Sequence, residues 1–98
     1  MKLINKYSKP FQKDYYCDLT SELDKLAGID PNGFWKHYIL ITGDHSIYIR
    51  IPGGSLGKIY VDANNVITKI TLDTNYVVKY PADVLDQLQK YVGQRIEF

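Results

Sequence analysis

Three neighbouring residues, Asp44, His45 and Ser46, are of the types that form a hydrolytic triad. In such a triad a carboxylate orients a histidine and the histidine takes a proton from the serine, so the three side chains must meet. Consecutive side chains of an extended chain point to opposite faces and do not meet. We therefore expect a polar hairpin turn here and no catalytic residue.

A glycine-rich segment, Gly53-Gly54-Ser55-Leu56-Gly57-Lys58, has the composition of a phosphate-binding loop. The phosphate loop of nucleotide-binding proteins needs a glycine five positions before its Gly-Lys pair and a serine or threonine after it. Pro52 and Ile59 occupy those two positions, and the residues that follow alternate like a strand. A strand offers no helix N-terminus to a phosphate group. The segment therefore predicts a hairpin connection rather than a nucleotide site.

Metal-ligating residue types are few in this chain. His37 and His45 are the only histidines, Cys17 is the only cysteine, and their spacing fits no zinc site. Asp62-Ala63-Asn64 begins like a calcium loop, but Val66 takes the fifth position, where an oxygen ligand is needed. His37 is in phase with the isoleucines of an expected strand, which predicts a hydrogen-bonded, half-buried histidine. We expect no metal, no cofactor and no enzymatic activity.

The composition is that of one folded domain spanning residues 1–98, since 45% of the residues are hydrophobic and disordered chains are far more polar. The 12 Lys and Arg residues nearly balance the 11 Asp and Glu residues, for a formal net charge of +1. Proteins that bind nucleic acid or acidic lipid by charge have a strong basic excess. Nucleic acid is therefore not expected as a partner, and neither is a membrane.

The sequence predicts a cytoplasmic protein. The lone Cys17 excludes an internal disulfide and suits a reducing compartment. The N-terminal residues have no apolar run of signal-peptide length, because Lys6 and Lys9 interrupt it. The longest wholly apolar stretch, residues 38–41, is far shorter than the ~20 residues of a membrane-spanning helix.

Apolar residues recur at helical spacing in two places. Leu19, Leu23 and Leu26 predict a helix over residues 12–27. Asp18 is expected to cap this leucine stripe, and Gly28 to end it. After Pro81, a second stripe predicts a C-terminal helix that stops at Gly93; the stripe consists of Val84, Leu85, Leu88 and Val92.

Between the two helices, apolar and polar residues alternate as they do in strands with one buried face. The segment with Ile47, Ile49 and Ile51 is the clearest case. Short turns between such strands join antiparallel neighbours. The expected fold is α+β: an antiparallel meander of four to five strands, with an N-terminal and a C-terminal helix packed on one face. Strands are expected at residues 35–42, 45–51, 56–62, 66–72 and 76–80, with a last short strand at 95–98.

Charge is uneven at the start of the chain. Residues 1–13 contain four lysines and no acid, whereas residues 14–30 contain five acids and one lysine. Acids in the first turn of a helix interact favourably with its dipole, so capping and a solvated helix face are one explanation. The other explanation is a docking surface for a basic partner, steered by charge and anchored by tyrosine. This candidate partner-binding patch consists of Asp14, Tyr15, Tyr16, Asp18, Glu22 and Asp24.

A second candidate surface is the outward face of the expected sheet. On a basic sheet face with interleaved aromatic residues, the bases of single-stranded RNA can stack on the rings while the cations neutralise its phosphates. It can also be a solvated face on which tyrosines and lysines merely pack, or a contact with a protein. If the isoleucines face the core, the outward face carries Tyr48, Arg50, Lys58 and Tyr60, joined by Lys36, Tyr38 and Lys69.

The C-terminal part of the chain resembles a known family. An expected strand ends in Tyr80-Pro81, and an amphipathic helix that stops at Gly93 follows it, with Ile96 close behind. Over residues 59–98 this succession is similar to the tail of the small bacterial immunity proteins of contact-dependent growth inhibition and related polymorphic toxin systems.

The resemblance implies a cytoplasmic, non-enzymatic protein that binds one cognate toxin domain and neutralises it. It implies a nuclease as the toxin, occlusion of the active site as the mechanism and a one-to-one complex. The matching segment is scaffold, so no binding residue carries over from the family. A small RNA-binding module that uses the Tyr/Lys/Arg sheet face is the alternative function.

Overall fold

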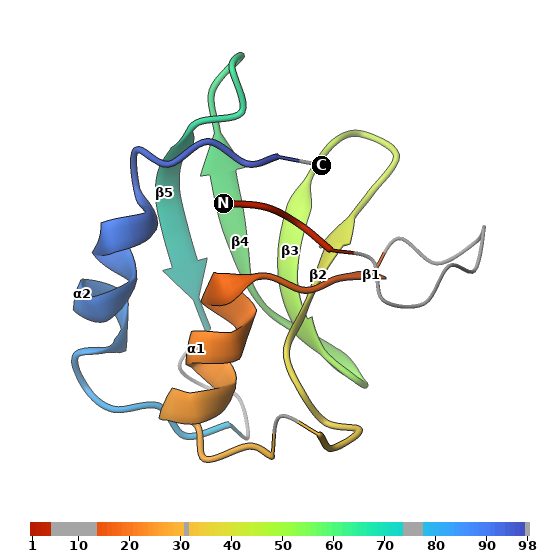
Figure 1. Cartoon of the computed structure of the whole chain (residues 1–98), viewed down its shortest axis with the longest axis vertical. Helices are drawn as coiled ribbons and strands as arrows, with labels where there is room; N and C mark the ends of the chain where they lie inside the picture. Colours follow the sequence, from red (N-terminus) through yellow and green to blue (C-terminus); the bar gives the residue numbers. More distant parts are fainter. Residues whose placement is uncertain (5–13, 31, 74–77, 98) are drawn as a thin grey trace.

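A computed structural model describes residues 1–4, 14–30, 32–73 and 78–97 of the chain (Figure 1). The strands form one antiparallel sheet in the order β1-β2-β3-β4-β5, so the predicted α+β fold with a meander sheet is confirmed. In chain order the elements are β1 (Asp14–Tyr15), α1 (Asp18–Leu26), β2 (Tyr38–Ile41), β3 (Ile47–Ile51), β4 (Gly54–Val61), β5 (Ile67–Leu72), α2 (Val84–Leu88) and the 3-10 turn η1 (Gln89–Tyr91).

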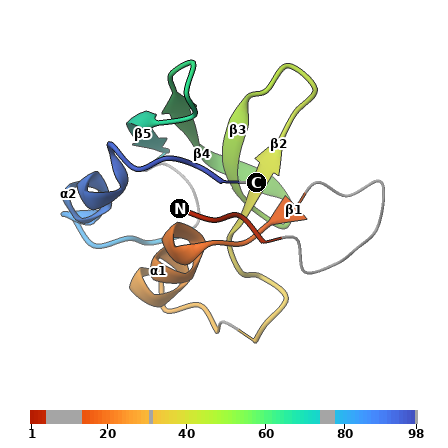
Figure 2. The same cartoon turned by 45° about the horizontal axis from the view of Figure 1, so that its top comes forward.

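Both helices pack on one face of the sheet, as predicted. In the two views of the molecule, α1, α2 and both chain ends lie on the same side of the strands (Figures 1 and 2). The period-2 alternation of β3 buries Ile47, Ile49 and Ile51 towards this side. The core between the layers also contains Leu19 and Leu23 of α1, Val84 and Leu88 of α2, Ile39, Ile59 and Ile70 of the sheet, and Leu3 and Ile96 near the termini.

Helix α1 is shorter than predicted at its beginning. The predicted helix over residues 12–27 is wrong before residue 18, and residues 12 and 13 lie outside the described residues. Asp14 pairs with Leu40 of β2, and Tyr16 exchanges two backbone hydrogen bonds with Ile4, 2.8 and 2.9 Å long. These long-range bonds satisfy backbone groups that a helix would otherwise pair locally, so tertiary contacts override the helical pattern.

The ends of α1 follow cap chemistry. Cys17, not Asp18, is the N-cap, with an extended backbone, and Thr20 Oγ1 accepts a hydrogen bond from the Cys17 N–H and donates one to the Cys17 carbonyl, both 2.9 Å. At the other end Gly28 has a φ of +69°, the left-handed conformation with which a glycine ends a helix, as predicted. The Gly28 N–H bonds to the Lys25 carbonyl at 3.2 Å, and the next N–H bonds to the Asp24 carbonyl at 2.8 Å.

Most strands are shorter than predicted. The alternating sequence pattern continues into loop residues that form no backbone pairs with a neighbouring strand. β2 begins at Tyr38 rather than residue 35, and β3 at Ile47 rather than residue 45. Residues 78–80 form no strand, and residues 76 and 77 lie outside the described residues. The predicted strand at 95–98 consists of two isolated bridges, Arg95 with Val66 and Glu97 with Lys2; residue 98 lies outside the description. Within the described ranges, neither helix has the length and apolar run needed to cross a bilayer.

Gly57 allows β4 and β5 to approach closely. A Cβ atom at this position would lie 1.9 Å from the carbonyl oxygen of Thr71, on the neighbouring strand. The glycine-rich segment thus begins as the predicted connection at Pro52–Gly53, but from Gly54 onward it is a strand. Only glycine fits at position 57, because the two backbones leave no space for a Cβ atom.

Gly57→Ala should therefore destabilise the protein by about 2 kcal/mol, because the added methyl group forces β4 and β5 apart. Gly43→Ala is the matched control: a Cβ there meets no atom within 4 Å, and the expected change is below about 0.5 kcal/mol. Urea denaturation of both variants measures the difference. Equal stability of the two variants would contradict the close approach.

Candidate binding surfaces

The predicted acidic patch does not form one surface. Asp14 and Tyr15 are consecutive residues of a strand, so their side chains point to opposite faces of the sheet. Tyr15 packs against the core, whereas Asp14 shares the outer face with Leu40, its partner on β2. The prediction that Asp14 and Tyr15 lie in the first helix is wrong, because they form β1.

Tyr16 and Asp18 lie on either side of the start of α1. Tyr16 bridges Ile4, and the Lys36 ammonium lies 4.7 Å from the centre of its ring. Asp18 is the first residue of α1 and is exposed. Asp18 is thus the member of the patch that the structure leaves open to solvent on the helix side.

Glu22 ties α1 to η1. Its carboxylate accepts a hydrogen bond from Lys90 Nζ at 2.5 Å and one from the Tyr91 hydroxyl at 2.7 Å. Partial burial opposes ionisation, but the contacts with Lys90 and Tyr91 outweigh it and lower the pKa of Glu22. Glu22 therefore has a structural role in addition to any role at the surface.

Asp24 does not belong to the surface at all. It is 5% exposed, and its Oδ1 accepts the backbone N–H and the Nδ1–H of His37, each at 2.7 Å. The helix turns this side chain towards the start of β2, where it meets donors that no local pattern indicates. The prediction that Asp24 is a partner-binding residue is wrong, because its side chain is buried against His37.

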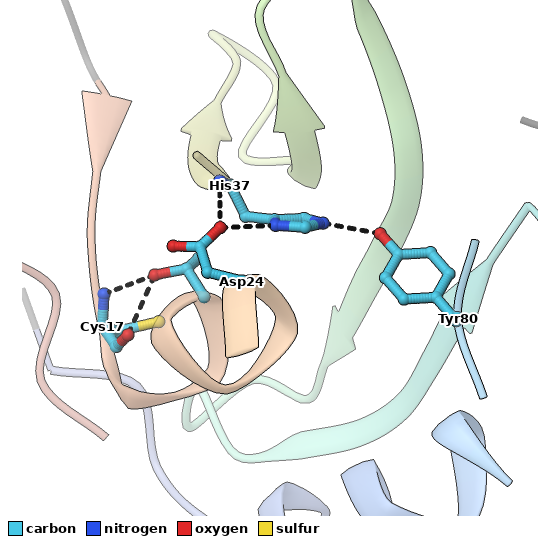
Figure 3. Close-up of polar contacts among 5 residues, drawn as sticks. Cys17, Asp24, His37 and Tyr80 are labelled. Carbon is cyan, nitrogen blue, oxygen red and sulfur yellow. Dashed lines mark hydrogen bonds and ion pairs between the residues drawn. The ribbon is translucent and has the colours of Figure 1, made fainter. Parts of the chain in front are cut away.

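His37 is the centre of a buried hydrogen-bonded chain (Figure 3). Its ring is fully buried, with Nδ1 at 2.7 Å from Asp24 and Nε2 at 2.6 Å from the Tyr80 hydroxyl. An ionised Asp24 can only accept, so Nδ1–H donates to it; in a neutral imidazole Nε2 then accepts from the Tyr80 hydroxyl. The predicted hydrogen-bonded histidine is confirmed, but its burial is complete rather than half.

The Asp24–His37–Tyr80 chain has the order of a catalytic relay, with a phenol in place of a serine. Burial, and then the charge of Asp24, raise the pKa of Tyr80. A phenol that holds its proton more tightly than usual is a poor nucleophile. The arrangement therefore supports a structural link between α1, β2 and the segment that leads to α2.

The predicted outward face of the sheet is assembled as expected for its strand residues, whereas Lys36, predicted on the first strand, lies in the loop before β2. The strand register places Tyr38 opposite Arg50, Tyr48 opposite Lys58 and Tyr60 opposite Lys69. In the described part of the chain, no helix covers this side (Figures 1 and 2). We call it the tyrosine–cation face; it consists of Lys36, Tyr38, Tyr48, Arg50, Lys58, Tyr60 and Lys69.

The cations of this face lie against the tyrosine rings. Lys58 Nζ is 5.6 Å from the ring centre of Tyr48 and 5.1 Å from that of Tyr60. Lys69 Nζ is 5.8 Å from the Tyr60 ring, and Arg50 Nε donates to the Tyr38 hydroxyl at 3.2 Å. Rings and cations therefore alternate across four strands.

Sequence analysis missed an exposed aromatic pair in the loop between α1 and β2. Phe34 is 79% exposed and Trp35 is 58% exposed, and their rings meet edge to face with centroids 6.0 Å apart. The Trp35 ring also lies 4.0 Å from the position of a Cβ on Gly53, in the β3–β4 turn. Trp35 lies in this loop, three residues before β2, and not in the strand predicted from residue 35.

Two serine-containing segments adopt no catalytic geometry. At the predicted hairpin turn, the Asp44 carboxylate accepts from the Thr42 hydroxyl and the Ser46 N–H, and these bonds lower its pKa. Gly53, Ser55 and Gly57 also have the Gly-x-Ser-x-Gly spacing of a nucleophile turn, so the prediction that the chain lacks this motif is wrong; the motif requires a strand before the serine and a helix after it. No helix follows Ser55, which lies in β4 with its Oγ 3.0 Å from Arg50 Nη1.

A cleft of about 770 Å³ lies at one end of the sheet, between the β2–β3 and β4–β5 turns. Apolar and polar side chains both line it, and the carboxylate of Asp62 is already hydrogen-bonded to the N–H groups of Asn64 and Val66. In the described ranges, no group of three His, Cys, Asp or Glu side chains is placed to hold a metal ion. The cleft is lined by Tyr15, Ile41, His45, Ile47, Val61, Asp62, Ala63 and Asn65.

Comparisons of the chain with protein-family profiles, with curated proteins and with solved structures find no match. The candidate surfaces therefore rest on this chain's own geometry.

Asp24→Ala should destabilise the fold by about 3 kcal/mol, since it leaves two buried donors of His37 without an acceptor. Asp18→Ala removes an exposed carboxylate from the same helix and should cost less than about 1 kcal/mol. Chemical denaturation measures both. If the two aspartates prove equally dispensable, the buried chain does not hold α1 in place.

Stability should fall as the pH rises above about 10, where the unfolded chain releases phenolic protons that the native state retains. Burial raises the pKa of both Tyr80 and Tyr91, so the native state binds more protons there and loses stability. Tyr80→Phe should make this alkaline slope shallower, and Tyr60→Phe, which alters an exposed ring, should not. Urea midpoints across the alkaline range give the slopes.

Proposed function

We propose that this protein is an immunity-type inhibitor that acts in the cytoplasm, where it binds one cognate toxin domain and blocks its active site. The proposal unites the family resemblance of residues 59–98 with one observation of geometry. That observation is the exposed Phe34–Trp35 pair, whose apolar surface the described fold leaves uncovered.

An exposed tryptophan beside an exposed phenylalanine is the composition of an interface anchor. Energetic hot spots of protein interfaces are enriched in tryptophan, and large aromatic side chains bury much area for few rotatable bonds. The edge-to-face contact between the two rings restricts their motion before any partner arrives. A preordered anchor loses less entropy on binding.

The acidic side chains that stay accessible fit a supporting role. Asp18 is exposed at the start of α1, whereas Glu22, which is partly exposed, is already paired with Lys90. Charges at the rim of an interface mainly accelerate the encounter with an oppositely charged partner. They would steer a basic toxin surface, such as the substrate-binding surface of a nuclease, towards the helix side of this protein.

The segment that carries the resemblance lies elsewhere in the fold. Residues 59–98 contribute the end of β4, β5, α2 and η1, which build the core with their apolar side chains. The aromatic pair belongs to the loop after α1, outside that segment. Scaffold and proposed contact are therefore supplied by different parts of the chain.

The proposal expects a toxin gene next to the gene of this protein, and co-expression with the toxin domain of that gene tests it. We expect growth to be rescued and the two proteins to co-purify in a one-to-one complex. Continued toxicity, with no complex formed by the purified proteins, would reject the immunity function.

Trp35→Ala and Phe34→Ala should each weaken toxin binding by about 30-fold or more, as expected for a hot-spot residue. Leu85→Ala is the control, because Leu85 is also an exposed apolar residue but belongs to α2. It should leave affinity unchanged. Isothermal titration calorimetry compares the three variants, and thermal melting checks that each is folded. Toxin affinity that survives both aromatic substitutions would place the contact on another surface.

A further inference from the structure

Tertiary structure separates the charges that balance in the sequence. The tyrosine–cation face carries Lys36, Arg50, Lys58 and Lys69. The carboxylates that accompany these cations are at its margins, Asp14 on the edge strand β1 and Asp73 just after β5. Asp18, Glu22 and Asp86 belong to the two helices, which lie across the sheet. Asp44 and Asp62 are in the turns at one end of the sheet, where each carboxylate accepts backbone N–H groups or a hydroxyl of its own turn.

A net charge of +1 for the whole chain therefore does not describe this face. Exposed charges farther apart than about 10 Å are largely screened at physiological salt, and packed layers are separated by about that distance. A ligand at the tyrosine–cation face meets its four cations before it meets the acids of the helices. The small net charge of the whole chain therefore does not exclude a polyanionic partner at this face.

The arrangement of rings and cations points to a particular kind of polyanion. Tyr38, Tyr48 and Tyr60 lie on three adjacent strands, and Lys58 lies between the last two rings. Single-stranded nucleic acid alternates planar bases with phosphates at a comparable spacing. Aromatic side chains stack with bases of any sequence, and cations between them pair with the phosphates.

We propose that the tyrosine–cation face binds single-stranded nucleic acid, with bases on the tyrosine rings and phosphates on Lys58, Arg50 and Lys69. An acidic protein surface would pair with the cations but would not stack on the tyrosine rings. Nucleic acid can contact both, so it fits this face better. A duplex keeps its bases paired and stacked internally, and cannot place them on the rings. This function is separate from the proposed inhibition of a toxin, which uses the Phe34–Trp35 pair.

The size of the face sets the expected strength. The strand register puts Tyr38, Tyr48 and Tyr60 on a diagonal, each about 7–8 Å from the next, so the three rings hold two or three bases. Such a short platform gives moderate affinity that falls with salt, because bound phosphates release counterions. The expected dissociation constant is on the order of 10 µM at about 50 mM salt, several-fold weaker at about 200 mM.

Fluorescence anisotropy with a labelled oligouridine of about 12 nucleotides measures this binding on the intact chain. Lys58→Glu should weaken it by about ten-fold or more, because it reverses a charge between two rings. Lys25→Glu changes the net charge by the same amount on the exposed side of α1 and should alter affinity less than about two-fold. Equal effects of the two substitutions would mean diffuse attraction and overturn the proposal.

Stacking is tested at Tyr60, whose ring is 41% exposed. Tyr60→Leu should weaken oligouridine binding by about five-fold or more, whereas Tyr60→Phe, which keeps the ring, should weaken it far less. Circular dichroism and melting curves confirm that both variants fold. A loss of equal size in the two variants would show that the hydroxyl, and not the ring, makes the contact, and would contradict base stacking.

Two competitors identify the class of ligand. A double-stranded RNA of the same length should compete less well than oligouridine, and an oligoglutamate peptide should hardly compete. Superior binding of the duplex or of the acidic peptide would overturn the proposal, the latter in favour of an acidic protein partner. Phe34→Ala should not change oligouridine binding, so failure here and failure of the toxin complex remain distinguishable.

Discussion

The pair of hydrogen bonds from His37 to Asp24 holds the two layers of this protein in one arrangement. Both donors and the acceptor are buried, so any other docking of α1 on the sheet would leave polar groups without partners. Tyr80 extends the chain to the segment that leads to α2. A small core gains specificity from this requirement, because apolar contacts alone tolerate many similar packings.

This docking decides which surfaces remain for partners. With α1 anchored on the inner side through Asp24, the loop that returns to His37 carries Phe34 and Trp35 to the outside. Since both helices occupy the inner side, the outer face of the sheet keeps its tyrosines and cations in contact with solvent. The two proposed binding surfaces are thus consequences of one buried polar link, although their chemistry differs.

Charge has to be considered by location in a protein of this size. Glu22, an acid of the predicted patch, is engaged with Lys90 and Tyr91, and Asp24 is internal. The patch predicted from composition therefore has fewer accessible acids than the sequence suggests. The cations of the sheet, in contrast, are more concentrated than the net charge implies, because neighbouring strands bring Arg50 and Lys58 onto one face.

The sequence by itself determined the α+β class, the meander of strands, the end of α1 at Gly28 and the strand residues of the tyrosine–cation face. These features follow from local periodicity and local backbone preference, which need no knowledge of distant residues. Only the tertiary structure decided that Asp24 is buried, that Asp14 and Tyr15 part to opposite faces, and that Trp35 is exposed. The first two depend on pairing between segments far apart in the chain: Asp24 bonds to His37, 13 residues away, and Asp14 pairs with Leu40 of β2. A helical or alternating pattern carries no information about such pairings, because the donor and the acceptor meet only when the layers pack.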